Sequence, residues 1–449
     1  MLLCGIVDEL PSIVAKTKNQ LSFFFCQGTD SRINHATAVL RGLLYLLLDQ
    51  QPHLLSHARK KFDHGGKSSF EDVNAWVALS EIFTDVLSEL HLASVYLIID
   101  ALDECIVDLP KLLDWIANTS SRFPRVKWIV SSRNWPIIEK GLNQTAQKTI
   151  LSLELNDRSV SAAVDKYVNF KVDWLARHNA YDLEEQHAVQ QSLLSKANGT
   201  FLWVALVCQE LKFISGWEAE EKIKEFPPGL EALYKQMMGQ IRKSELCKSI
   251  LAVMVMVYRP ITVHELGSLV SMPARSVGSY KATAEIVGRC GSLLALREHT
   301  VSFIHQSAKD FLLNEESDEI FPSGTKAIHH SLFSRSLQAM SETLVRDIYK
   351  TNSPEVHIGQ VKPPDPDPLR AVRYSCLYWI NHLQECVLGE VTREDLQDGG
   401  LVDKFLRKKY LNWLEALSLL ASIPKGALSI VNLEGLILVR TVSASAERF

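Results

Sequence analysis

The sequence predicts an α/β protein, with a parallel β-sheet at its N-terminal end followed by a helical domain, a winged helix and an all-α tail. Three apolar runs in the first part of the chain, at 21–26, 95–102 and 126–131, are rich in β-branched or aromatic residues. Helical patterns separate them, which is typical of parallel strands buried on both faces and joined by helices. From residue 156 onward the pattern is helical, apart from one short hairpin signal. Together these observations favour a doubly wound sheet that carries helical additions.

Composition sets the broad class of the protein. Its 449 residues can bury a sizeable core, and 47% hydrophobic with 22% charged residues is ordinary for a globular protein. A net charge of −4 gives no reason to expect nucleic-acid binding or attraction to a membrane surface. The eight cysteines are scattered without a CxxC pair, which favours reduced thiols in a reducing compartment.

The apolar segments are too short for membrane insertion. The run at residues 1–7 faintly resembles a signal peptide, but it has no positive flank before it and is cut by Asp8 and Glu9, so we do not expect it to act as one. The apolar run at 250–258 is too short to span a bilayer. We expect a cytoplasmic protein with no stable membrane insertion.

Changes of pattern along the chain predict six segments. The sheet occupies 1–155, a helical domain 156–245, a winged helix 246–318, a helical extension 319–360, a stiff proline-rich linker 361–368 and a C-terminal helical segment 369–449. Within the winged helix, Thr262 and Glu265 have the spacing of a capping box. Short strands at 293–296 and 300–304, and a helix at 305–313, complete that pattern.

Three carboxylates follow the second apolar run. Asp100 stands at the tip of the run 95–100, and Asp103 and Glu104 follow it closely. Ligands of open α/β sheets bind at the carboxyl ends of the strands. In phosphate-transferring sites a strand-end aspartate holds Mg²⁺, and a neighbouring acid positions the attacking water. The alternative is an ordinary acidic loop between a strand and a helix, without a functional role.

Two further positions are candidates for phosphate contacts. Arg133 follows Ser131 and Ser132 at the tip of the third run, so its guanidinium would face the same edge of the sheet. His305 stands at a strand-to-helix junction, where a ring N–H can donate to a phosphate oxygen. The alternatives are a surface arginine at a strand end and a structural histidine.

Taken together, these residues resemble the NACHT family of STAND-class, signal-transducing ATPases, and most of all the fungal NLR-like proteins of the heterokaryon-incompatibility type. The specific motifs are Asp100-Ala101-Leu102-Asp103-Glu104 and the run 303–313, Phe-Ile-His-Gln-Ser-Ala-Lys-Asp-Phe-Leu-Leu. The segments 21–27, 131–133, 199–204 and 227–230 support them. The likeness extends over nearly the whole chain.

The resemblance implies a P-loop NTPase-like sheet and a switch gated by ATP and ADP. Asp100 would be the magnesium residue, Asp103 and Glu104 the hydrolytic acids and Arg133 the sensor. His305 would touch the β-phosphate of ADP in a closed state, and exchange to ATP would open the module for self-oligomerisation and protein partners. The segment at Gly199 and Phe201 would lie against adenine, although the proline often found there is absent.

The glycine-rich loop G-x-x-x-x-G-K-[ST] of the family is missing from this sequence. We expect residues 1–7 to begin the helix that follows such a loop, so the first strand and the loop would lie upstream of residue 1. The local candidate Gly65-Gly66-Lys67-Ser68 has Lys61 where the first glycine belongs, and a charged helix pattern precedes it. Without the loop, three charge-assisted hydrogen bonds of roughly 1.5–3 kcal/mol are lost, about 10³-fold or more in affinity.

Two classes of function therefore remain. The first is a nucleotide-dependent signalling switch, impaired in nucleotide and Mg²⁺ binding. The second is a non-enzymatic interaction scaffold derived from a NACHT protein. DNA binding through the winged helix is a weaker reading, because its presumptive recognition stretch at 279–289 carries only two basic residues.

Overall fold

The structure is a computed structural model that describes residues 2–14, 19–66, 70, 75–89, 94–133, 135–142, 157–273, 279–351, 361–386 and 394–446. The chain divides into two compact units. The first comprises 1–149, 258–260 and 422–430, and the second comprises 150–257, 261–421 and 431–449. Each unit is described by itself.

The first unit contains the parallel sheet that the sequence predicts. Its strands β1 (Gln20–Phe25), β2 (Val95–Asp100) and β3 (Val126–Val130) lie in that order and coincide with the three apolar runs. Phe25 is opposite Asp100 in the first pairing, and Ile99 is opposite Val130 in the second. Both pairings are parallel, so the carboxyl ends of all three strands meet at one edge.

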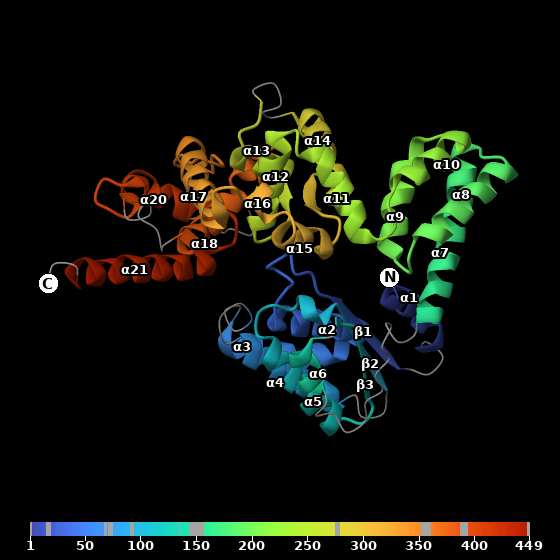
Figure 1. Ribbon diagram of the computed structural model, residues 1–449. Helices are drawn as coiled ribbons and strands as arrows, with labels where there is room; N and C mark the ends of the chain where they lie inside the picture. Colours follow the sequence, from blue (N-terminus) through green and yellow to red (C-terminus); the bar gives the residue numbers. More distant parts are fainter. Residues whose placement is uncertain are drawn as a thin grey trace. The chain divides into compact units, whose positions relative to one another are not determined.

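Alternation along the strands divides the sheet into two apolar faces. On one face, Leu21 and Ile98 pack with Leu3 of α1 (Leu2–Val14). On the other, Leu97 and Ile99 join the main core. That core is covered by α2 (Ala36–Gln50), α4 (Ala75–Glu89), α5 (Leu109–Arg122) and α6 (Pro136–Leu142), beside which α3 (Leu55–Gly65) lies (Figure 1). Helices on both faces confirm the doubly wound arrangement.

The second unit begins with helices only. They are α7 (Asp157–Asn179), α8 (Leu183–Lys196), α9 (Phe201–Glu210), α10 (Gly216–Glu225), α11 (Leu230–Ile241) and α12 (Glu245–Met256). Gly199 has a φ of +66° in the turn between α8 and α9, a backbone conformation that glycine adopts without strain. Pro227, Pro228 and Gly229 separate α10 from α11, as the sequence predicts.

The winged-helix pattern is present in the second unit. It comprises β4 (Ile261–Thr262), α13 (Val263–Leu269), α14 (Tyr280–Gly288), β5 (Leu294–Arg297), β6 (Thr300–Phe303) and α15 (Gln306–Asn314). The three strands form an antiparallel sheet in the order β4-β6-β5. The capping box is confirmed, because Thr262 accepts from the backbone N–H of Glu265 at 3.2 Å and Glu265 accepts from that of Thr262 at 2.8 Å.

The remaining helices are α16 (Ser317–Ile320), α17 (Gly324–Thr343), α18 (Arg373–Cys386), α20 (Leu401–Leu419) and α21 (Ile423–Ala446). The side chains of Phe333, Trp379, Phe405 and Trp413 pack edge-on or stacked at the centre of α17, α18 and α20. The proline-rich segment ends in a short 3₁₀ helix, Pro368–Ala371. None of the helices in the described ranges is long and apolar enough to cross a bilayer.

Every cysteine in the chain is a free thiol, and all except Cys4 are buried. Burial raises the pKa of the Cys105, Cys208 and Cys376 thiols to about 12. These thiols are therefore protonated at neutral pH and act as small apolar side chains, as the sequence predicts.

Candidate functional site

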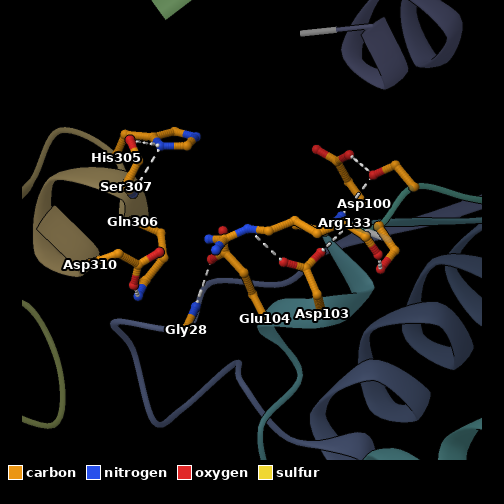
Figure 2. A network of polar contacts seen from close by, with 12 residues as sticks. Gly28, Asp100, Asp103, Glu104, Arg133, His305, Gln306, Ser307 and Asp310 are labelled. Atoms are coloured by element: carbon orange, nitrogen blue, oxygen red, sulfur yellow. Dashed lines mark hydrogen bonds and ion pairs between the residues drawn. The ribbon is translucent and has the colours of Figure 1, made fainter. Parts of the chain in front are cut away.

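The candidate site lies at the carboxyl edge of the parallel sheet (Figure 2). Strand β2 ends at Asp100, and Ala101 follows in the left-handed region with φ 52° and ψ 53°. This turn leads directly into the 3₁₀ helix Leu102–Glu104. A left-handed alanine is uncommon, and it allows three acids to leave the strand in a compact turn.

Asp100 is fixed in place by the neighbouring strand. The Ser131 hydroxyl donates to Oδ1 of Asp100, and the same hydroxyl accepts from the backbone N–H of Ala101 at 2.9 Å. Two backbone bonds tie the strand ends together: Ser131 N–H donates to Ile99 at 3.0 Å, and Leu102 N–H donates to Ser131 at 2.9 Å. Ser131 therefore orients the carboxylate and stabilises the left-handed turn.

Asp103 is paired with Arg133. The Arg133 guanidinium Nε lies 3.1 Å from Oδ2 of Asp103, and the Arg133 backbone N–H donates to Oδ1 at 3.0 Å. The Asp103 side chain is 4% exposed and that of Arg133 is 47% exposed. The buried Asp103 carboxylate is thus compensated by one cation and one backbone donor, and both come from Arg133.

Glu104 is held by the loop that follows β1. Its Oε2 accepts from the backbone N–H of Gly28 at 2.8 Å. The Asn34 side chain in turn donates to the Gly28 carbonyl at 3.3 Å, and the Asn34 carbonyl accepts from the N–H of Ile106 at 2.7 Å. The loops after β1 and β2 are therefore joined on both sides of the acidic turn.

The acidic groups also affect Cys26 at the end of β1. Burial raises the pKa of its thiol, and the negative charges of Glu104, Asp100 and Asp103 raise it further, together with Cys105. The edge of the sheet is thus a region of negative potential. A divalent cation would be stabilised there.

The donor set fits magnesium as an ion shared with a phosphate ligand. Among the described residues, no three His, Cys, Asp or Glu side chains are grouped so that they could hold a metal ion by themselves. Mg²⁺ in phosphate-transfer sites usually keeps several waters and takes one or two carboxylates together with substrate phosphates. Asp100, at the strand end and only partly buried, suits that role.

The glycine-rich candidate at 65–68 is at the wrong end of a helix. Gly65 is the last residue of α3, and Gly66, with φ +65°, donates its N–H to the carbonyl of Phe62. Helix C-termini present carbonyl oxygens, which repel anions. A helix precedes this segment rather than a strand, as predicted, and Lys67 and Ser68 lie outside the described residues.

His305 belongs to the second unit, where it caps α15. Its Nδ1 accepts from the backbone N–H of Ser307 at 3.1 Å and lies 2.8 Å from the Ser307 hydroxyl. That hydroxyl is 3.0 Å from the hydroxyl of the buried Tyr234 (Figure 2 shows the His305–Ser307 contact). Because Nδ1 accepts a backbone N–H, Nε2 carries the proton of the neutral ring. The exposed imidazole thus has a ring N–H of the kind that phosphate contact requires.

The segment predicted to face adenine borders a pocket of about 240 Å³ within the second unit. Its lining residues are Ser161, Val164, Asp165, Leu194, Ser195, Ala197, Asn198 and Gly199. Phe201 packs edge-on against Tyr167, with ring centroids 5.6 Å apart. The lining contains no basic side chain, so it does not suit a phosphate group.

The structure therefore brings Asp100, Asp103, Glu104 and Arg133 together at one edge of the sheet. Sequence reasoning did not anticipate that Ser131 orients Asp100 or that Gly28 holds Glu104. The signal for Ser131 was available: a hydroxyl residue at the tip of a strand parallel to the Asp100 strand. Nothing in the sequence marks Gly28, because a backbone donor has no side-chain signature.

Two family models of known proteins match this chain, one over the parallel sheet and one over the winged helix. A family model described as "Nephrocystin 3, N-terminal" matches residues 1–133, and one described as "GPI inositol-deacylase, winged helix domain" matches residues 234–322. The second match confirms the winged helix. Among solved structures, the Walker-type ATPase PABY2304 of Pyrococcus abyssi matches 66% of this chain and 85% of its own. Its identity is 12% and its TM-score 0.30, so it carries no argument here.

A curated relative matches along almost the entire sequence. The vegetative incompatibility protein HET-E-1 of Podospora anserina is 50% identical over 456 residues. The match covers 97% of this chain and 34% of that protein. The chain therefore spans about a third of the length of this relative.

Proposed function

The chain belongs to the NACHT-type proteins of the heterokaryon-incompatibility kind, and on that premise we propose that it is a nucleotide-dependent switch module. In this proposal ATP and ADP favour different states of the module, and the open state engages protein partners or further copies of the chain. The chain spans only 34% of its relative, so the activity of the whole relative does not transfer directly to it. A role in fungal non-self recognition or programmed cell death is therefore part of this proposal.

The residues at the sheet edge support distinct roles. Asp100, oriented by Ser131, is the residue that would hold Mg²⁺, which when bound neutralises phosphate charge. Asp103 and Glu104 are the acids that would position a water, and Arg133 is the cation that would meet the terminal phosphate. In the second unit, the Nε2–H of His305 would donate to the β-phosphate of ADP.

One observation carries the proposal: the Asp103–Arg133 pair at 3.1 Å. The arginine is half exposed, so its guanidinium can turn from the carboxylate to an anionic ligand, whose charge would then replace that of Asp103 as its partner. Such a ligand would draw the cation away from Asp103, which would keep the backbone N–H of Arg133 as a donor. The presence of a phosphate group is thereby coupled to the state of a hydrolytic acid.

We further propose that nucleotide binding by this chain is weak. The sequence contains no G-x-x-x-x-G-K-[ST] loop, and the candidate glycines Gly65 and Gly66 lie at the C-terminal end of α3. The backbone donors that usually carry most phosphate contacts are missing from these 449 residues. Steady-state hydrolysis should then be undetectable.

The scaffold alternative also has a specific observation in its favour. Asp103 and Glu104 already have protein partners, Arg133 and Gly28, so neither acid requires a ligand for its burial. In that case the acidic turn would only hold the ends of the three strands together. The helical tail and the winged helix would bind a partner without nucleotide control.

Calorimetric titration with MgADP and MgATP separates the two functions. For the switch we expect a dissociation constant in the high micromolar range, about 10-fold weaker in Asp100→Asn, because the carboxylate that meets Mg²⁺ is removed. A dissociation constant below about 10 μM would contradict the impairment. Binding that is equal in both proteins, or absent at millimolar nucleotide, would favour the scaffold.

A further inference from the structure

Helices α17 and α18 pack against each other in the second unit (Figure 1). The rings of His329 and His382 meet between these two helices. Nδ1 of His329 lies 2.8 Å from Nδ1 of His382, and the ring centroids are 5.1 Å apart. His382 is completely buried, and its Nε2 lies 2.8 Å from the hydroxyl of Tyr374, which is also completely buried. Both nitrogens of His382 are thus engaged within the core.

This geometry restricts how many protons the pair can hold. A hydrogen bond between two Nδ1 atoms requires a proton on one ring and a lone pair on the other. If both rings were protonated, two N–H groups would face each other across 2.8 Å. The closed pair therefore holds at most one imidazolium, whereas two separated histidines each take up a proton near pH 6.5.

The surroundings also disfavour charge on the pair. Burial lowers the pKa of His382 well below its ordinary value, and His329 lowers it further. Burial lowers the pKa of His329 as well; Lys309 of α15 lowers it further, and Glu385 of α18 opposes this. The thiol of Cys386 lies close by and donates to the His382 carbonyl at 3.0 Å. Burial raises the pKa of this thiol; Asp395 and Glu385 raise it further, and Lys326 opposes this.

We propose that His329 and His382 form an acid-sensitive latch, which holds α17 against α18 at neutral pH and releases the two helices as the pH falls below about 6. The sign follows from the lowered basicity of the folded pair. Its contribution to stability is present above the range in which free histidines titrate and is lost as the pH falls through that range. The latch does not depend on the nucleotide proposal.

The size of the effect follows from the proton count. At and below about pH 6.5 two separated rings carry at least one extra proton between them, so an uncharged closed pair binds at least one proton fewer than the open state. The ratio of open to closed forms then rises about tenfold for each pH unit. A further charge near Lys309 increases the effect, because like charges in a buried site repel.

Hydrogen exchange in α17 and α18 tests the latch in the full chain. Backbone exchange, corrected for the intrinsic rate, is measured at pH 7.5, 6.5 and 5.5 by mass spectrometry. We expect opening of these helices to increase about tenfold between pH 6.5 and 5.5 in the unaltered chain. The double variant His329→Gln and His382→Gln keeps an amide pair without titration, so its opening should not change over this step.

The matched control is His330→Gln. His330 follows His329 in the same helix but contacts a carboxylate, with its Nε2 2.7 Å from Asp395. This variant should retain the acid-dependent opening. An equal pH dependence in the double variant, or none in the unaltered chain, would overturn the proposal.

A second measurement needs no variant. In the unaltered chain with labelled imidazoles, NMR should show that the His382 ring stays uncharged from pH 7.5 to 6 while α17 and α18 remain protected. Ordinary titration of that ring near pH 6.5 in the protected state would contradict the latch. Protection of the helices by added zinc, reversed by EDTA, would also contradict it, because it would make the pair a metal site.

Discussion

Ser131 is the residue whose role in the acidic site is most specific. Its hydroxyl both donates to Asp100 and accepts from Ala101, so Ser131→Ala removes two hydrogen bonds and leaves the left-handed turn only its backbone bonds to the strand end. We expect a loss of about 1–3 kcal/mol in the free energy of unfolding, measured by urea denaturation. Ser132→Ala is the control, because the exposed Ser132 hydroxyl donates to the carbonyl of the adjacent Arg133 and does not orient Asp100, so its change should stay within about 0.5 kcal/mol. Equal losses of stability in Ser131→Ala and Ser132→Ala would show that Ser131 does not orient Asp100.

The Asp103–Arg133 pair should respond asymmetrically to substitution. Arg133→Ala leaves a carboxylate that is 4% exposed without its cation, which should cost about 1–3 kcal/mol of stability. Asp103→Asn leaves an arginine that is 47% exposed and can be hydrated, and it keeps an acceptor for the Arg133 N–H. Asp103→Asn should therefore lower the free energy of unfolding by less than Arg133→Ala does.

The double variant completes this test. Adding Asp103→Asn to Arg133→Ala removes the unpaired buried charge and should recover part of the lost stability. Additive losses in the denaturation midpoints would show that Asp103 is solvated in solution, and the proposed coupling between phosphate and acid would lose its basis.

At the scale of elements, His305 combines a structural role with a proposed functional one. As the N-cap of α15 it satisfies the backbone N–H of Ser307, so His305→Ala should cost about 1 kcal/mol of stability. His305→Asn restores the cap without an imidazole. If the ring contacts ADP, both variants should weaken ADP more than ATP by about 10- to 100-fold, the value of one charge-assisted hydrogen bond.

The measurement is competition between ADP and ATP for each variant, with thermal denaturation to report the cap. If His305→Asn is stable and retains the nucleotide preference, the histidine is a cap and nothing more. If only His305→Ala changes the preference, the effect comes from a frayed helix, because the asparagine variant keeps the cap.

Most elements could be predicted from local patterns. The strands β1, β2 and β3 stand out as apolar runs, and the capping box at Thr262 marks the start of α13. The strand β4 could not be predicted, because two residues carry no periodicity and its pairing with β6 is formed across the whole winged helix. Long-range pairing decides such elements.

The site was predictable only in part, for a related reason. Parallel strands place their carboxyl ends at one edge, so Asp100 and Arg133 could be placed together from the order of the elements. The contact between Ser131 and Asp100 depends on the register in which Ile99 is opposite Val130. The contact between Glu104 and Gly28 depends on a loop conformation. Neither is encoded in a short motif.

At the scale of the whole molecule, the chain combines an acidic strand edge, a half-exposed arginine and a winged helix capped by a histidine. The relationship to HET-E-1 extends along 97% of this chain, so the combination belongs to one type of protein and not to unrelated parts. What the 449 residues lack is a glycine-rich phosphate loop. In the proposed function, Asp100, Asp103, Glu104 and Arg133 would supply the remaining contacts at this edge.

The most direct test is to supply that loop. A β-strand and a G-x-x-x-x-G-K-[ST] loop from a nucleotide-binding ATPase would be fused before residue 1, and MgADP binding measured by calorimetry. We expect the affinity for MgADP to rise about 10³-fold or more over the 449-residue chain, and we expect Asp100→Asn or alanine at the loop lysine to remove the gain. No gain in affinity from a folded fusion, or a gain unaffected by Asp100→Asn, would contradict this expectation.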